Sequence, residues 1–390
     1  MQLAGDVETL PGHARSPHLH RIARPLVSWW HGNHATGSWF GLRPRLDGTG
    51  IVVEGSWLSD TSLVLEGGAR RRAAGRYLLD VNATFDLERL AGLRGATLFV
   101  DGQRHHGREG SADAGDLQGV SGFDAEDRLQ IAEAWLELRP AAGLRIKLGK
   151  VDANGEFAYV DAAAELVHAS AGMSPTLLAL PTYPDPAWSL NLFADRGGLH
   201  LGLGVYDGAT LQGEATGDHA PRWLLDGERF WIGEAAWRWP RGRLAAGLWH
   251  YEGRVERLDG GGRDGTGGRY LTAEAAVAGD PEGRGLRLFL QWGSADDAVS
   301  EVRRHLGAGL RWGGPLTARP DDALIAYASR VTPSRDLDPA TRPETATELT
   351  YRLQLTPFLA LQPDLQWIRH PGGAGLDDTT LVGLRVEVVL

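Results

Sequence analysis

Apolar and polar residues alternate one by one in segment after segment of this 390-residue chain. In residues 199–206, for example, leucine and valine alternate with His200, Gly202, Gly204 and Tyr206. Successive side chains of a β-strand point to opposite faces, so each such segment predicts a strand with one apolar face. The same alternation occurs at 79–87, 132–139, 144–148, 286–292, 305–312, 348–355 and 382–390. An all-β fold is therefore expected.

Counting these patterns predicts about sixteen strands. The expected spans are 49–58, 76–87, 94–103, 128–139, 143–151, 187–195, 198–207, 229–239, 242–252, 268–277, 285–293, 301–312, 322–330, 346–356, 358–368 and 379–390. Many of them match the roughly 9–11 residues that a tilted strand needs to cross a bilayer, whereas strands of globular proteins are usually about 5–6 residues long.

The predicted connections alternate between short and long. Short turns contain the sequences ERLAGL, PAAG, RGG, PR, GGPLTARPD and TP, and longer loops lie near 104–127, 152–186, 208–228, 253–267 and 331–345. Short periplasmic turns and long extracellular loops are typical of outer-membrane barrels. The pattern thus favours a 16-stranded antiparallel transmembrane β-barrel, with the apolar face toward lipid and the polar face toward a lumen.

A soluble β-sandwich would also show alternation, because one face of each sheet packs and the other meets water. Two features favour the barrel. The predicted strands are long, and small residues on the polar face, such as Gly202, Gly204, Gly307 and Gly309, leave room for an interior. A soluble adhesin-like sandwich remains the structural alternative.

Motifs of enzymes are absent from the sequence. It has no GxSxG, HExxH, P-loop or dinucleotide fingerprint, and it has no cysteine. The paired histidines at 31, 34, 105 and 106 are interpreted as solvated loop residues, so no metal and no cofactor are expected. A net charge of −10 without a dense basic run argues against a nucleic-acid partner. The prediction is a protein that is not an enzyme, and a barrel enzyme of the outer membrane is the lower-ranked alternative.

Two segments outside the strands carry further predictions. Residues 1–48 are expected to form an N-terminal periplasmic segment before a single barrel domain, 49–390, and no secretory signal is visible in them. The connection 152–186 is long, proline-rich in its second half and rich in apolar residues, so it is expected to fold inward and narrow the pore. Tyr183 and Trp188 are the candidates for this constriction.

Charged and aromatic residues at inward positions are the candidates for contact with a solute. Rings of charge select solutes in pores, planar Arg and carboxylate groups can pair with sugar hydroxyls, and aromatic rings can stack on sugars. The alternative is that they only hydrate the channel and pair with one another. The candidates are Glu133, Trp135, Glu137, Arg145, Lys147, Arg287, Arg311, Glu348, Arg352 and Arg385.

Four segments, in order along the chain, resemble the carbohydrate-selective porins of the OprB type. The first segment, GSWFGLRPRLDGTG, resembles the family's opening through Trp39, Gly41, Leu42 and Arg43, with Phe40 where glycine is usual. The other three segments carry the following matching residues: Gly149, Lys150, Asp152 and Phe157; Gly309, Gly313, Arg319, Pro320 and Asp322; Glu348, Tyr351, Pro357, Gln362, Pro363, Asp364, Gln366, Pro371 and Gly372.

The resemblance implies a sixteen-stranded barrel in the outer membrane of a Gram-negative bacterium that passes glucose-like monosaccharides by facilitated diffusion. It also implies inward-folded loops and pore-lining arginines. The expected partners are small sugars, outer-membrane lipid and, in a homo-oligomer, further copies of the chain. A general or weakly charge-selective diffusion porin is the alternative function. The chain departs from the family at Leu390, where many such barrels end in phenylalanine.

Overall fold

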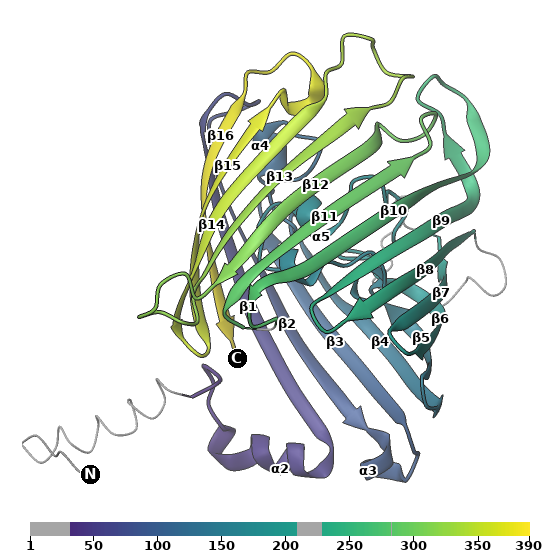
Figure 1. The fold of residues 1–390 in the computed structure, drawn as a ribbon, viewed down its shortest axis with the longest axis vertical. Helices are drawn as coiled ribbons and strands as arrows, with labels where there is room; N and C mark the ends of the chain where they lie inside the picture. The colour runs from purple at the N-terminus through teal and green to yellow at the C-terminus, as the bar shows by residue number, and fades with distance from the viewer. Residues whose placement is uncertain (1–31, 209–227, 282) are drawn as a thin grey trace, which may run out of the picture.

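Sixteen antiparallel strands form one closed barrel in the computed structural model, which describes residues 32–208, 228–281 and 283–390 (Figure 1). Each strand pairs with its sequence neighbours, and β16 pairs with β1. The strands are β1 (Ile51–Glu66), β2 (Ala73–Asp86), β3 (Ala96–Gly107), β4 (Arg128–Ala141), β5 (Leu144–Val151), β6 (Ala187–Arg196), β7 (Leu199–Asp207), β8 (Arg229–Trp239), β9 (Gly242–Glu256), β10 (Gly262–Gly279), β11 (Gly285–Ala295), β12 (Val302–Gly313), β13 (Ala323–Pro333), β14 (Glu344–Thr356), β15 (Leu359–Arg369) and β16 (Thr379–Val389). The predicted sixteen-stranded fold is confirmed, and closure removes both sheet edges.

The outer face of the barrel is apolar. Large side chains that point outward are exposed on neighbouring strands, among them Leu203, Leu244, Leu248, Leu290 and Leu306. Leu248, for example, is 66% exposed. This is the band that a transmembrane barrel presents to lipid. No helix in the described ranges is long and apolar enough to span a membrane.

One predicted long loop is wrong. The sequence predicts a loop near 253–267. In the structure, β9 and β10 remain paired beyond Arg254 and Asp264, so the loop between them contains only residues 257–261. Gly265, at a φ of +75°, forms a bulge between Asp264 and Thr266. The glycine-rich composition around it hides the alternation that would have revealed the strand. The predicted loop 208–228 lies almost entirely outside the described residues.

A bulge also shifts the faces of β4. Asp101 of β3 pairs with Glu133, but the next residue, Gly102, pairs with Ile131, so Ala132 is an extra residue. Ile131 is therefore exposed on the outside, while Ala132 is buried. The prediction that Ala132 shares the apolar outer face was wrong, because a bulge reverses the alternation without changing the residue types.

The short-turn end carries the start and end of the described chain (Figure 1). The helices η1 (Trp39–Gly41) and α2 (Leu42–Thr49) precede β1, and α3 (Leu87–Ala91) lies between β2 and β3. Arg43 of α2 donates hydrogen bonds to the carbonyl oxygens of Val53 and Leu390, at 2.9 and 3.0 Å, and lies over the Trp39 ring. These contacts join the helix to both strands of the closing seam.

Two connections fold into the barrel from the long-loop end. Residues 108–127 contain α4 (Ser111–Ala114), and residues 152–186 contain η2 (Ala153–Gly155), η3 (Asp161–Ala163) and α5 (Ala169–Gly172). A further short turn, η5 (Pro371–Gly373), precedes β16. Apolar residues of the two inward segments, such as Phe157, Val160, Leu177 and Val120, are buried against the inner wall in three clusters. The predicted inward course of 152–186 is confirmed.

Candidate functional site

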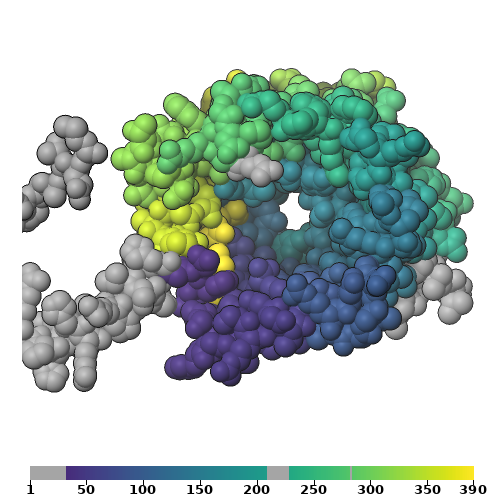
Figure 2. Space-filling view, turned by 60° about the horizontal axis from the view of Figure 1, so that its bottom comes forward, coloured from purple at the N-terminus to yellow at the C-terminus, as the bar shows by residue number. Residues whose placement is uncertain are grey.

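An opening passes through the barrel beside the inward segments (Figure 2). The segment 152–186 packs on the wall formed by β6 to β14, through clusters that include Phe230, Trp249, Phe289 and Tyr327. Inner residues of the opposite wall, on β2 to β5, are less covered. The free passage is therefore bounded by this wall on one side and by the inward segments on the other.

A stacked aromatic pair lies on the less covered wall. Phe99 of β3 and Trp135 of β4 have ring centroids 4.8 Å apart with planes inclined by 19°. The Lys147 Nζ atom lies 3.8 Å from the Trp135 ring centroid, and the indole N–H donates to Glu133 at 3.1 Å. Lys147 therefore lies over the Trp135 ring, whereas Glu133 lies at the edge of the indole. Sequence periodicity identified Trp135, Lys147 and Glu133, and it missed Phe99.

A cluster of four charged residues adjoins this pair. Arg145 donates to Glu137 at 3.1 Å and to Glu156 at 3.0 and 2.6 Å, and its guanidinium lies 3.8 Å from the Phe193 ring centroid. Lys147 also donates to Glu156. Burial alone would raise the pKa of Glu156, but the hydrogen bonds from Arg145 and the charge of Lys147 outweigh it and lower the pKa below its usual range. Glu156 lies in an inward segment without periodicity, so sequence reasoning did not find it.

The other predicted inner arginines also have carboxylate partners. Arg287 donates to Glu274 at 2.8 Å, Arg311 to Glu165 at 2.6 Å, and Arg352 to Glu387 at 2.6 Å. These pairs link the wall to itself or to the inward segment, and each sets the charge of an arginine against that of a carboxylate.

Three wall carboxylates hold the backbone of the inward segment. Glu234 of β8 accepts from the N–H of Ala158 at 2.9 Å, and Glu274 of β10 accepts from that of Ala162 at 2.9 Å. Glu348 of β14 accepts from Val167 and His168, at 2.8 and 3.0 Å. We call Glu234, Glu274 and Glu348 the anchor carboxylates. A buried N–H without a partner costs free energy, so each anchor satisfies donors that the irregular backbone leaves open.

The assignment of Glu348 and Arg385 to the pore surface is corrected by these contacts. Both side chains point inward, but both are buried beneath the inward segment. Arg385 donates twice to Asp60 at 2.8 Å and once to the carbonyl oxygen of Leu166 at 3.3 Å. Period two reveals the face of a strand, but it does not reveal what covers that face. These two residues support the constriction rather than line it. Glu137 and Lys147 are buried as well, so their assignment to the pore surface is corrected in the same way.

The two constriction candidates have different locations. Tyr183 lies in the inward segment, where its hydroxyl donates to the carbonyl oxygen of Phe123 at 3.0 Å and its N–H to Asp152 at 3.2 Å. It thus joins the two inward segments. Trp188 is the second residue of β6, and it points outward because its neighbours Ala187 and Ser189 are buried on the inner side. The placement of Trp188 in the constriction loop was wrong.

Asp116, in the first inward segment, gives a pH-dependent prediction. Burial, together with the charge of Glu344, raises the pKa of the Asp116 carboxyl to about 8. The folded state therefore binds a proton between about pH 4 and pH 8 that the unfolded state has lost, so this group lowers stability as pH rises through that range. We expect Asp116→Asn to match the wild type in thermal stability at pH 5 and to exceed it at pH 8.5. The difference in the free energy of unfolding between the variant and the wild type should grow by at most about 1.4 kcal/mol per pH unit.

The measurement is the temperature at which the barrel loses its folded mobility in gel electrophoresis, taken at both pH values. Asp259→Asn, in the exposed turn after β9, is the control and should show no such change. A gain that is equal at both pH values would contradict the assignment.

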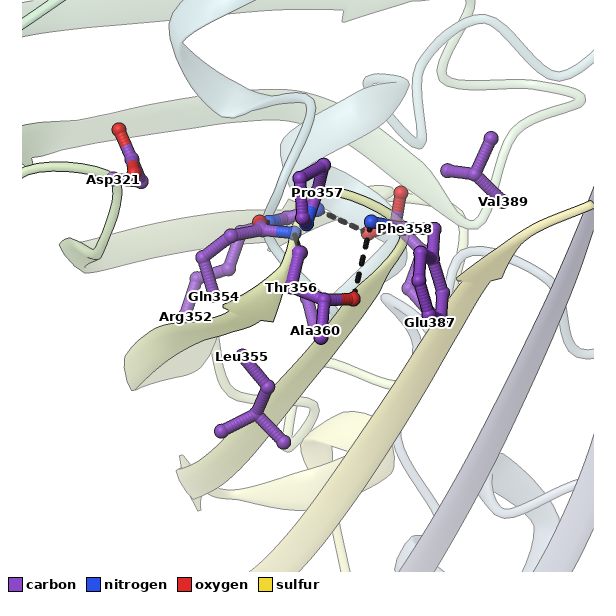
Figure 3. A pocket seen from close by; sticks show the side chains of 10 residues that line it. All are labelled: Asp321, Arg352, Gln354, Leu355, Thr356, Pro357, Phe358, Ala360, Glu387 and Val389. Carbon is purple, nitrogen blue, oxygen red and sulfur yellow. Dashed lines mark hydrogen bonds and ion pairs between the residues drawn. The ribbon is translucent and has the colours of Figure 1, made fainter. Parts of the chain in front are cut away.

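A separate cavity of about 530 Å³ lies at the short-turn end, between β14, β15 and β16 (Figure 3). Arg352, Gln354, Glu387 and Asp321 give it polar groups. The Gln354 amide donates to the carbonyl oxygen of Thr356 at 2.7 Å, which fixes the turn below it. Since liquid water occupies about 30 Å³ per molecule, a cavity of this volume can hold several waters together with a small solute.

Comparison with known proteins shows where this architecture recurs. The model of the family "Carbohydrate-selective porin, OprB family" matches residues 70–390. Porin B of Pseudomonas aeruginosa is 29% identical in an alignment of 128 residues that covers 27% of this chain and 28% of that protein, so the chain matches less than a third of the length of this curated relative.

Two solved structures of Pseudomonas putida OprB share the fold. The high-pH structure has a TM-score of 0.85 at 20% identity, and the low-pH structure a TM-score of 0.62 at 16% identity. Each alignment covers 92% of this chain and 99% of the other. A triple mutant of the Rhodopseudomonas blastica porin has a TM-score of 0.54 at 13% identity, over 87% of this chain and all of that one.

Proposed function

The chain belongs to the carbohydrate-selective porins of the OprB family, and from this premise we propose that it passes glucose-like monosaccharides across the bacterial outer membrane by facilitated diffusion. It is a channel and not an enzyme. The observation that carries the proposal is the narrowed passage between the β2–β5 wall and the anchored inward segments, with the stacked pair Phe99–Trp135 on its wall.

The chemistry of this wall suits a neutral, hydroxyl-rich solute. An aromatic face offers an apolar surface to the C–H side of a sugar ring, and the charged groups at its border offer donors and acceptors to hydroxyls. Because Arg145, Lys147, Glu137 and Glu156 neutralise one another, the wall carries little net charge. We propose that Phe99, Trp135 and Glu133 contact the passing sugar, and that the buried Lys147 supports the Trp135 ring.

The cavity at the short-turn end fits the same route. Under this proposal it is the exit vestibule toward the periplasm, and α2 lies on that side (Figure 1). Arg352 and Glu387, which form an ion pair there, would meet the solute after the constriction.

Reconstituted liposomes test the proposal. We expect glucose and other monosaccharides to enter faster than amino acids of equal size in a swelling assay. In Trp135→Ala, the sugar preference should fall by about twofold to tenfold, the range expected from loss of one aromatic contact.

The matched control is Trp237→Ala, which removes an exposed tryptophan of the outer face of β8. It should leave the preference unchanged. Equal rates for sugars and amino acids in the wild type would refute sugar selectivity and favour a general diffusion porin. An unchanged preference in Trp135→Ala would refute the role of the aromatic pair.

A further inference from the structure

Four arginines point outward from neighbouring strands near the long-loop end of the barrel. They are Arg269 of β10, Arg304 of β12, Arg330 of β13 and Arg369 of β15, and we call them the outer arginine row. All four side chains are exposed. Each continues an outward series of apolar residues, since Leu271, Leu306, Ala328 and Trp367 are the next outward residues on the same strands.

The strand register sets these arginines in a regular arrangement. Arg269 pairs across the sheet with Ser294, and Ser294 pairs with Arg304. Arg330 pairs with Thr345, and Thr345 pairs with Arg369. In each half of the row, a residue with a hydroxyl group lies between two arginines on three adjacent strands. The backbones of the two arginines are therefore about 10 Å apart.

The opposite end of the same strands has no such charge. The outward residues there are Val277, Leu286, Trp312, Leu324, Leu355 and Leu359. The outer surface of β10 to β15 is thus cationic at one membrane boundary and apolar at the other.

Most of this positive charge is not neutralised by the protein. Arg269 lies 5.6 Å from the Trp292 ring centroid, and Arg369 lies 5.5 Å from that of Trp367. Asp378 is 3.9 Å from Arg369, whereas Arg304 and Arg330 have no ion-pair partner within the part of the chain that the structure describes. The nearby Asp297 pairs instead with Arg303 and Arg335.

An anion supplied by the membrane explains the arrangement. An arginine on the lipid face is costly at the midplane of the bilayer and costs little near the interface, so the row lies at the depth where lipid headgroups can reach it. Guanidinium groups bind phosphate in a bidentate manner. The long-loop end of an outer-membrane barrel faces the outer leaflet.

We propose that the outer arginine row binds the phosphate groups of a phosphorylated lipid in the outer leaflet. The two arginines of each half hold anionic headgroups, and the hydroxyls of Ser294 and Thr345 between them add donors. Trp292 and Trp367 orient two of the guanidinium groups at the level of the headgroups. The acyl chains lie against the outward leucines below the row.

Native mass spectrometry of the full chain in mild detergent tests the proposal. The probes are diphosphorylated lipid A, the same lipid without phosphates, and inorganic phosphate as a competitor. We expect the wild type to retain diphosphorylated lipid A. The variant Arg304→Gln/Arg330→Gln should bind it about tenfold or more weakly, since each arginine near a charged membrane surface contributes about 1 kcal/mol.

The matched control is Arg94→Gln/Arg196→Gln, which removes two exposed arginines at the short-turn end. It should bind as the wild type does. Electrophoretic mobility of the unheated barrel verifies that every variant is folded, and single-channel conductance should be unchanged in both, which keeps this test separate from that of sugar passage.

Four results would overturn the proposal. One is equal binding of the lipid with and without phosphates. Another is unchanged binding in the row variant. The third is displacement of the lipid by low millimolar inorganic phosphate, which would indicate a site for free phosphate. A change in the number of copies per particle without a change in bound lipid would also overturn it, in favour of a second copy of this chain as the occupant.

Discussion

Replacing Glu274 and Glu348 together by alanine is expected to widen the pore and to raise its single-channel conductance by roughly twofold or more, with loss of sugar preference. The two anchor carboxylates accept from the backbone of Ala162 and from that of Val167 and His168. Without them, buried N–H groups lose their partners at a cost of about 1–3 kcal/mol each. A conformation in which the inward segment leaves the barrel interior, so that these N–H groups bind water, then becomes more favourable.

The barrel itself should survive this change, because every strand keeps both of its neighbours. The effect is therefore expected in conductance and selectivity and not in folding. Planar-bilayer recordings with and without glucose measure both, and electrophoretic mobility of the unheated protein reports on the barrel.

Two further variants sharpen the comparison. Glu66→Ala/Glu256→Ala removes the same charge from exposed ends of β1 and β9, and it should leave the pore unchanged. Glu274→Gln/Glu348→Gln keeps an acceptor oxygen at each position. Its single-channel conductance should therefore lie between that of the wild type and that of the alanine variant. If the alanine variant conducts like wild type, the apolar clusters around Phe157 and Leu166 hold the segment without the anchors.

The second large effect is expected at the seam that closes the barrel. Asp60 of β1 and Arg385 of β16 face each other with two hydrogen bonds of 2.8 Å, and the Asp60 side chain is only 3% exposed. Asp60→Ala should destabilise the barrel by about 3–5 kcal/mol, because it leaves the buried guanidinium without its counter-charge. Ser121 also loses the acceptor of its 2.7 Å hydrogen bond.

The urea concentration at which the barrel unfolds measures this effect. Asp259→Ala, which removes an exposed partner of Arg257, should leave stability unchanged, because ion pairs in solvent contribute little. Adding Arg385→Leu to Asp60→Ala should restore much of the loss, since removal of both charges avoids the unpaired one. An Asp60→Ala variant as stable as wild type would show that the seam does not depend on the pair.

The strands could be predicted because each carries its own evidence. Lipid on one side and a polar interior on the other impose a period of two, which survives in the sequence wherever the strand is regular. The prediction failed at Ala132, where a bulge reverses the two faces of the strand. It also failed around Gly265, where glycines show no alternation of polar and apolar side chains. Both failures have the same cause. The alternation of side chains reveals a regular strand, but at these positions the backbone forms a bulge that the side chains do not reveal.

The candidate site was only partly predictable. Arg145, Lys147, Glu133, Glu137 and Trp135 were identified and are brought together beside the passage. Glu156 and Glu165, which pair with the inner arginines, lie in a segment whose conformation follows no local period. Glu234 and Glu274 are on regular strands, but nothing in their alternation distinguishes a carboxylate in water from one that holds a backbone.

The sequence by itself determined the number of strands, most of their bounds, the inward and outward faces away from the bulges, and the inward course of residues 152–186. It ended the first strand at residue 58, whereas β1 continues to Glu66. Only the tertiary structure decided which inward residues meet the passage and which are buried beneath the inward segments, as Glu348 and Arg385 are. The physical reason is that a strand's faces follow from its own side-chain order, whereas the cover on the inner face comes from residues more than a hundred positions away. The outer arginine row likewise depends on tertiary structure, because its four arginines lie at the same level of the barrel only through the pairing register of strands β10 to β15.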